Sequence, residues 1–107
     1  MPEAPLRIET APEAEQDLHE IVEYWSVRGE AWRGEKYFRD LTDIAHAELS
    51  DIHRARRGRF LRSKRQPLAR EFLAFGVYRI IYRIDEEARA VKILRFWHAH
   101  RDTPELD

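Results

Sequence analysis

Two helical patterns separated by a single glycine place the strongest constraint on the fold of this chain. Apolar residues recur at steps of three and four over about residues 12–28 and again over about residues 30–53, which is the period of one face of an α-helix. Gly29 is the predicted end of the first helix. Because the linker is so short and each apolar stripe needs a partner to bury it, we predict an antiparallel helical hairpin.

The segment before this hairpin predicts a short strand followed by the start of a helix. Residues 6–10 alternate between apolar and polar side chains, as a strand does. Thr10, Pro12 and Glu13 then form a capping-box pattern with a proline in the first turn. We therefore expect the Thr10 hydroxyl to accept a hydrogen bond from the first backbone N–H groups of the helix.

The last third of the chain has the sequence pattern of β-strands. Strand-like runs at residues 68–75, 77–85 and 90–98 are separated by Gly76 and by residues 86–89. Connections this short favour antiparallel pairing. We predict an α+β fold of order β-α-α-β-β-β, in which the helical hairpin packs on one face of a small, mostly antiparallel, four-stranded sheet. The 107 residues are expected to form a single domain.

The last two strands differ in their pattern. Alternate side chains of a strand point to opposite faces of the sheet, so residues 77–85 are predicted to have one core face and one basic face. The core face holds Tyr78, Ile80, Tyr82 and Ile84, and the basic face holds Arg79, Ile81 and Arg83. Residues 90–98 have apolar side chains at both parities. This indicates either a central strand covered on both faces or a strand with a β-bulge.

Charge is divided unevenly along the chain. The net charge is −1, but residues 1–51 hold five basic and 13 acidic residues, a net of −8, and residues 52–107 hold 14 and seven, a net of +7. Residues 53–66 contain seven Arg or Lys and no acidic residue, and are predicted to form an exposed loop. That loop is either a solvated surface or a contact surface for phosphates or for an acidic protein.

The candidate target-binding residues come from this loop and from the end of the last strand. They are Arg56, Arg57, Arg59, Arg62, Lys64, Arg65 and Trp97. Trp25 and Trp32 are expected in the core, whereas Trp97 lies beside His98 where the strand is expected to emerge.

Several classes of function are disfavoured by the composition. The chain has no cysteine, and no apolar run approaches the roughly 20 residues that span a bilayer. We expect no membrane insertion and a cytoplasmic location. His98, His100 and Asp102 could share one side of a strand end, but no further His or Cys motif supports a metal site. Scattered glycines give no phosphate-binding loop, so neither a metal nor a cofactor is expected.

Acid–base cleavage of RNA is the one catalytic reading that the residues allow. It needs a general acid or base and cations around the transition state, which His98 could supply with Arg79, Arg83, Arg95 or Arg101. The alternative is a packing histidine at a strand end and a solvated arginine face.

Four segments together resemble the ParE/RelE superfamily of bacterial toxins. They are AEQDLHEIVEYW at residues 14–25, RRGR at 56–59, YRIIYRID at 78–85 and ILRFWHAHRD at 93–102. The resemblance runs from about Leu6 to Thr103. It implies a toxin of a type II toxin–antitoxin module, held inactive in a hetero-oligomer with a cognate antitoxin.

The resemblance leaves two modes of toxicity open. RelE-like members cleave mRNA on the ribosome, whereas ParE-like members inhibit DNA gyrase without being enzymes. The long helical hairpin and the H-x-x-R-D ending that begins at His98 favour the ParE-like side, as does a nearly neutral net charge. His98 also matches a histidine of some ribonuclease members, so the RelE-like alternative stays open.

Overall fold

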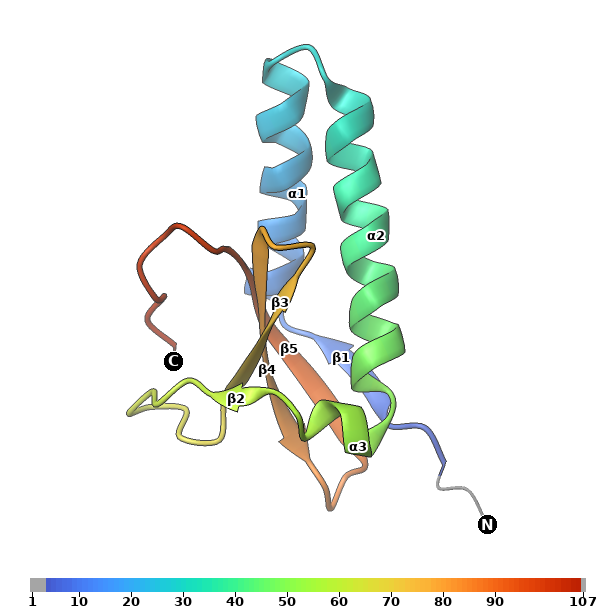
Figure 1. The fold of residues 1–107 in the computed structure, drawn as a ribbon, viewed down its shortest axis with the longest axis vertical. Coiled ribbons are helices and arrows are strands. Elements are labelled where there is room, and N and C mark those ends of the chain that lie inside the picture. The colour runs from blue at the N-terminus through green and yellow to red at the C-terminus, as the bar shows by residue number, and fades with distance from the viewer. Residues whose placement is uncertain (1–3, 107) are drawn as a thin grey trace.

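The computed structural model describes residues 4–106 and shows a helical hairpin packed against a twisted sheet (Figure 1). The elements in chain order are β1 (Arg7–Thr10), α1 (Pro12–Val27), α2 (Ala31–Leu49), α3 (Ile52–Ala55), β2 (Arg59–Phe60), β3 (Arg70–Ala74), β4 (Tyr78–Asp85) and β5 (Ala90–His98). The strands form one mixed sheet of order β1-β5-β4-β3-β2. Strand β1 runs parallel to β5, and the other pairs are antiparallel.

The predicted α+β fold and hairpin are confirmed, but the sheet has five strands rather than four. The additional strand β2 lies in the basic segment that was predicted to be a loop. Its two residues pair with β3, Arg59 opposite Glu71 and Phe60 opposite Arg70. So short a strand has no room for the alternation that identifies strands in a sequence.

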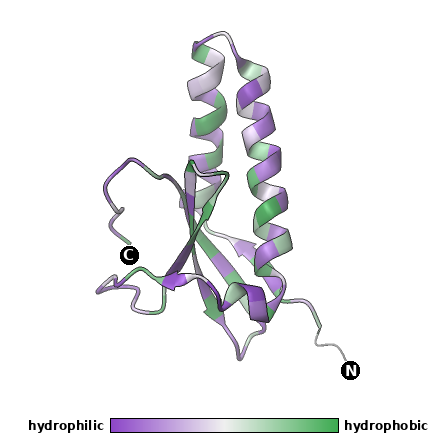
Figure 2. Cartoon of the chain, in the orientation of Figure 1, coloured by the Kyte–Doolittle hydropathy of each residue, from purple (hydrophilic) through white to green (hydrophobic). Residues whose placement is uncertain are grey.

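The turn and the close approach of the two helices depend on glycines. Gly29 has a φ of +75°, and the N–H groups of Gly29 and Glu30 return to carbonyls of the last turn of α1. This left-handed cap is the one predicted from the glycine. Gly34 of α2 lies against α1, where an added Cβ would be 2.8 Å from the Cα of Val22. Figure 2 shows hydrophobic and hydrophilic residues alternating along both helices.

Helix α1 begins at the predicted Pro12, but its predicted cap and the predicted end of the second helix are wrong. Ala11, not Thr10, is the N-cap of α1, and no side chain caps it, because Thr10 is the last residue of β1. Helix α2 ends at Leu49, four residues before the predicted end. There the Asp51 carboxylate accepts from the backbone N–H groups of His53 and Arg54 and starts the separate helix α3. These hydrogen bonds hold the pKa of Asp51 below its usual value.

The main core lies between the hairpin and one face of the sheet. The core side of β4 is the predicted one, since Tyr78, Ile80 and Tyr82 are buried with residues of both helices. The Tyr82 hydroxyl donates to the carbonyl of Ala55, which ties α3 to the sheet.

Both alternatives raised for the last strand apply to β5. It is a central strand, and the pairing skips Leu94, because Ile81 lies opposite Arg95 while Tyr82 lies opposite Ile93. This bulge lets Ile93 and Phe96, three residues apart, both enter the main core. Leu94 instead contributes to a second apolar cluster.

This second cluster is formed by Ala69, Ile81, Trp97 and Leu106, with Leu61 and Leu94 packed against it. Leu106 thus brings the C-terminal segment (residues 101–106) against the sheet. No helix among the described residues is long and apolar enough to cross a membrane.

Candidate functional site

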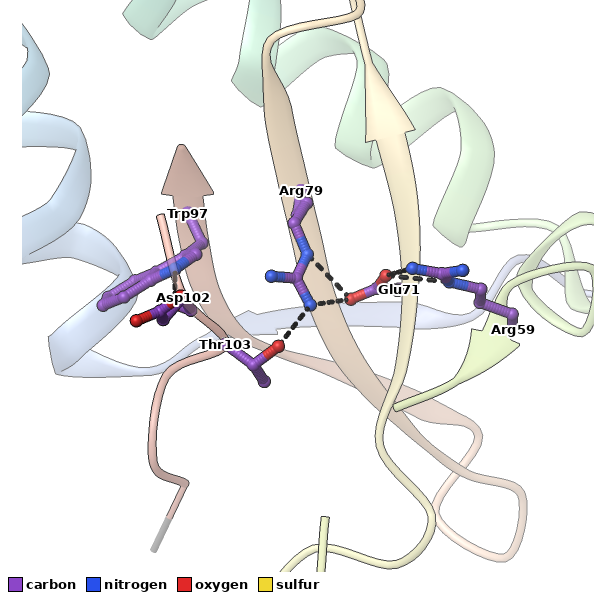
Figure 3. Close-up of polar contacts among 6 residues, drawn as sticks. All are labelled: Arg59, Glu71, Arg79, Trp97, Asp102 and Thr103. Carbon is purple, nitrogen blue, oxygen red and sulfur yellow. Dashed lines mark hydrogen bonds and ion pairs between the residues drawn. The ribbon is translucent and has the colours of Figure 1, made fainter. Parts of the chain in front are cut away.

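A buried glutamate organises the arginines at the outer end of the sheet. Glu71 of β3 accepts two hydrogen bonds from Arg59 at 2.6 and 2.9 Å and two from Arg79 at 2.6 and 3.0 Å (Figure 3). Its side chain is 5% exposed. Burial on its own would raise the pKa of Glu71, but the two guanidinium groups outweigh it and the pKa is lowered. Glu71 is therefore a carboxylate that fixes two cations.

The C-terminal segment is held by contacts to this network and to Trp97. The Trp97 Nε1 donates to the Asp102 carbonyl at 2.6 Å, and Arg79 Nη2 donates to the Thr103 hydroxyl at 3.2 Å (Figure 3). The Arg101 guanidinium lies 3.8 Å from the centroid of the Trp97 ring. Trp97 is consequently only 8% exposed.

A second ion pair joins α1 to β5. Asp17 accepts from Arg95 at 2.7 and 2.8 Å and from the backbone N–H of Phe96 at 3.0 Å. The hydrogen bonds that Arg95 donates to Asp17 raise the pKa of Arg95, so the guanidinium stays charged. Both oxygens of the buried Asp17 carboxylate accept hydrogen bonds, and the ion pair with Arg95 holds the hairpin on the sheet.

His98 lies on the opposite face of the sheet from Arg79, in a cleft beside α1. The cleft has a volume of about 500 Å³ and is lined by residues of both helices, of β4 and β5, and by Arg101. The His98 ring packs edge-on against Tyr78, and its Nδ1 accepts from the backbone N–H of His100 at 3.2 Å. With Nδ1 as the acceptor, a neutral His98 ring carries its proton on Nε2.

The structure does not bring the candidate ribonuclease residues into one site. His98 is paired with Tyr78, whose side chain is in the main core, whereas the next pair, Arg79 and Trp97, points to the other face of the sheet. Arg83 and Arg95 line a separate, smaller cleft of about 240 Å³ beside the C-terminal segment. Of the four candidate arginines, Arg101 alone shares the cleft of His98.

The basic segment is exposed, as predicted, but several of its cations are already paired. The exposed candidates are Arg56, Arg57, Arg59, Arg62, Lys64 and Arg65. Arg56 pairs with Glu86 and Arg59 with Glu71. Within residues 4–106, no acidic side chain forms an ion pair with Arg57, Arg62 or Lys64, and these three define what we call the free basic group.

The burial of two tryptophans differs from the prediction. Trp32 is 60% exposed, so its expected place in the core is wrong, and Trp97 lies beneath the C-terminal segment. Sequence reasoning missed Glu71, Asp17 and the anchoring role of Leu106. A lone acidic residue in an otherwise strand-like run was the available signal for Glu71.

The family model described as the ParE toxin of the type II toxin–antitoxin system parDE matches residues 8–103. This chain therefore belongs to the ParE toxin family. No curated protein sequence matches it significantly.

Two solved structures are similar over most of both chains. One is a chain of the toxin–antitoxin complex RelBE2 from Mycobacterium tuberculosis, with 25% identity, a TM-score of 0.68, and coverage of 92% of this chain and 95% of that one. The other belongs to the chromosomal ParDE toxin–antitoxin system of P. aeruginosa, with 19% identity, a TM-score of 0.69, and coverage of 87% and 95%. At 19% identity, the similarity to this second structure shows a common fold and no more.

Proposed function

We propose that this chain is a ParE-like toxin that inhibits DNA gyrase by binding it, without cleaving RNA, and that a cognate antitoxin neutralises it in a cytoplasmic hetero-oligomer. Membership of the ParE family supports the toxin role. In this proposal the toxin forms one domain and needs no metal or cofactor. Loss of the antitoxin would release the toxin and arrest growth, which is how such a module would stabilise a plasmid.

The observation that carries the non-enzymatic mechanism is the separation of His98 from the sheet arginines. A general acid or base must lie within hydrogen-bond reach of the same substrate that the cations stabilise. Here Arg79 and Arg95 donate to buried carboxylates, and their side of the sheet is not the side of His98. Each of these two guanidinium groups is therefore paired with a carboxylate of the fold itself.

The free basic group is the proposed contact surface for the target. Arg57, Arg62 and Lys64 are exposed, and they follow α3 on the rim of the sheet. Phe60, 50% exposed on the same segment, adds an apolar side chain that a protein target could bury. Cations beside an exposed aromatic side chain suit a protein surface that carries acidic residues.

Two assays test this function directly. Purified gyrase is incubated with the toxin and its supercoiling activity is measured, while translated mRNA is examined for cleavage by primer extension. We expect loss of supercoiling with intact mRNA. Replacing Arg57, Arg62 and Lys64 together by Gln should weaken the inhibition, and the matched control is Arg7→Gln on the exposed strand β1. Intact supercoiling with cleaved mRNA would overturn the proposal.

The second candidate function is the RelE-like ribonuclease, favoured by one observation. The cleft of about 500 Å³ places His98 beside Arg101, which is a donor pair that a phosphate could contact. In that case mRNA cleavage would depend on both residues.

A further inference from the structure

One arginine of the sheet lacks the kind of partner that its neighbours have. Strands β2, β4 and β5 contain Arg59, Arg79, Arg83 and Arg95. Arg59, Arg79 and Arg95 each donate from Nε to a buried carboxylate, at 2.9, 3.0 and 2.7 Å. The Nε of Arg83 is buried as well, but it has no acceptor in the described part of the chain. A buried donor without an acceptor costs free energy, which a ligand with acceptor oxygens would recover.

Two like charges meet at the same place. Arg83 of β4 lies directly opposite Lys92 of β5, so both side chains leave the same face of the sheet. No carboxylate among residues 4–106 forms an ion pair with either of them. The neighbour of Lys92 on β1 is Glu9, whose carboxylate is bound by Arg7 at 2.8 Å. Like charges directly opposite each other destabilise a sheet, and a bound anion would offset that repulsion.

These two cations line the cleft of about 240 Å³ beside the C-terminal segment. The other charged residues of the lining are Arg95, which is paired with Asp17, and the glutamates Glu13 and Glu105. Both glutamates are exposed. Their carboxylates can accept hydrogen bonds from hydroxyl groups, and they repel a long polyanion. Pockets for drug-sized ligands begin at roughly 300 Å³, so a cleft of this size suits a smaller ligand.

A phosphate monoester is the anion that suits this arrangement best. It carries about −1.5 to −2 charges at neutral pH, which matches one guanidinium and one ammonium group. A guanidinium group binds phosphate oxygens through two parallel N–H donors, and an ammonium group binds them as a point charge. Hydroxyl groups on the same molecule would meet the carboxylates beside the cations.

We propose that the cleft of Arg83 and Lys92 binds a small phosphate monoester that carries hydroxyl groups, such as a polyol or sugar phosphate. The phosphate lies on the two cations, and Glu13 and Glu105 accept hydrogen bonds from the hydroxyl groups. Binding at this cleft does not depend on gyrase inhibition or on an antitoxin, so failure of the proposed function would leave it unchanged.

The Nε–H signals of the arginines in an NMR spectrum of the full chain report on this site. Arg83 is the probe, and Arg79, whose Nε donates to Glu71, is the internal control. The ligands are glycerol phosphate, inorganic phosphate, glycerol, and a single-stranded oligonucleotide without a terminal phosphate. We expect glycerol phosphate to shift the Arg83 signal and not the Arg79 signal. It should bind about fivefold more tightly than inorganic phosphate, because the carboxylates add a hydrogen bond of ordinary net strength.

Variants of the two cations locate the binding by calorimetry. Arg83→Gln and Lys92→Gln should each weaken the binding of glycerol phosphate by at least about tenfold, because each removes a charge-assisted hydrogen bond. Arg39→Gln, at an exposed arginine of α2 outside the cleft, should bind like the wild type. Lys92→Gln removes one of two like charges and leaves the buried Arg83 in place, so it should fold even if Arg83→Gln does not.

An Arg83 signal that responds to neither phosphate, or wild-type affinity in Lys92→Gln, would overturn the proposal. Tighter binding of the oligonucleotide than of glycerol phosphate would overturn it too, because the cleft would then be part of a nucleic-acid surface.

Discussion

Arg95 of β5 and Asp17 of α1 are joined by two parallel hydrogen bonds of 2.7 and 2.8 Å, across 78 residues of sequence. The same carboxylate accepts from the backbone of Phe96, so one side chain fixes both the ion pair and the strand. A bidentate arginine–carboxylate pair is directional as well as strong. It sets how the hairpin sits on the sheet.

Replacing Asp17 by Ala should destabilise the fold. Arg95 would lose its partner and the Phe96 N–H its acceptor, but the Arg95 side chain is 23% exposed and could reach water. We expect a loss of about 2–3 kcal/mol, below the value for a fully buried pair. Urea unfolding measures it, with Glu23→Ala on the exposed face of α1 as the control that changes stability by less than about 0.5 kcal/mol. Equal midpoints for the two variants would contradict the structural role of the pair.

The Glu71 network should make stability sensitive to acid. The pKa of Glu71 is lower in the folded chain than in the unfolded chain, so its contribution is present above the unfolded value of about 4.3 and is lost as the pH falls through the folded pKa. Glu71→Gln should therefore cost free energy of unfolding at pH 7 and progressively less below about pH 4. Denaturant unfolding of both proteins across this range measures the difference. A constant difference across the range would show that the carboxylate charge is not what stabilises the site.

Truncating Leu106 should let the C-terminal segment detach from the sheet and expose Trp97. Leu106 is 7% exposed and packs in the second cluster, and its replacement by Ala should cost about 1–2 kcal/mol, less than a central core leucine because the segment can leave the sheet. Detachment would break the bond from Trp97 Nε1 to Asp102, so the exchange of the Trp97 indole proton should accelerate. Glu105→Ala, an exposed neighbour, is the matched control and should leave that exchange unchanged.

Gly34 should resist substitution because the helices approach each other there. An added methyl group would lie 2.8 Å from the Cα of Val22, which is backbone and cannot rotate away. Gly34→Ala should cost about 1–3 kcal/mol, although alanine is the better helix former. Thermal unfolding measures this, with Gly29→Ala as a comparison, where the cost comes from the φ of +75° and nothing lies within 4 Å of the added Cβ. A gain in stability for Gly34→Ala would contradict the close packing of α1 and α2.

Local periodicity predicted the hairpin, the three antiparallel strands and the core face of β4. Each of these depends on residues close in sequence, where spacing and alternation are visible. The two-residue strand β2 and the skipped Leu94 have no such signature. The choice between a solvated and a functional arginine face could not be made either, because it depends on Glu71 and Asp17.

These two acids are far from some of their partners in the sequence. Glu71 meets Arg79 across adjacent strands, but Asp17 meets Arg95 only after the hairpin has packed on the sheet. The sequence placed His98 and Arg79 in one candidate site, whereas the register of β4 and β5 puts them on opposite faces of the sheet. That register, and the pairing of the arginines with buried carboxylates, cannot be read from alternation within a single strand.

In the proposed function, His98 is not a catalytic residue and the toxin acts by binding. The most direct measurement compares the wild-type toxin with His98→Ala in the gyrase supercoiling assay, with mRNA cleavage followed in parallel. We expect both proteins to inhibit supercoiling equally and neither to cleave mRNA. Cleavage by the wild type that disappears in His98→Ala would contradict it.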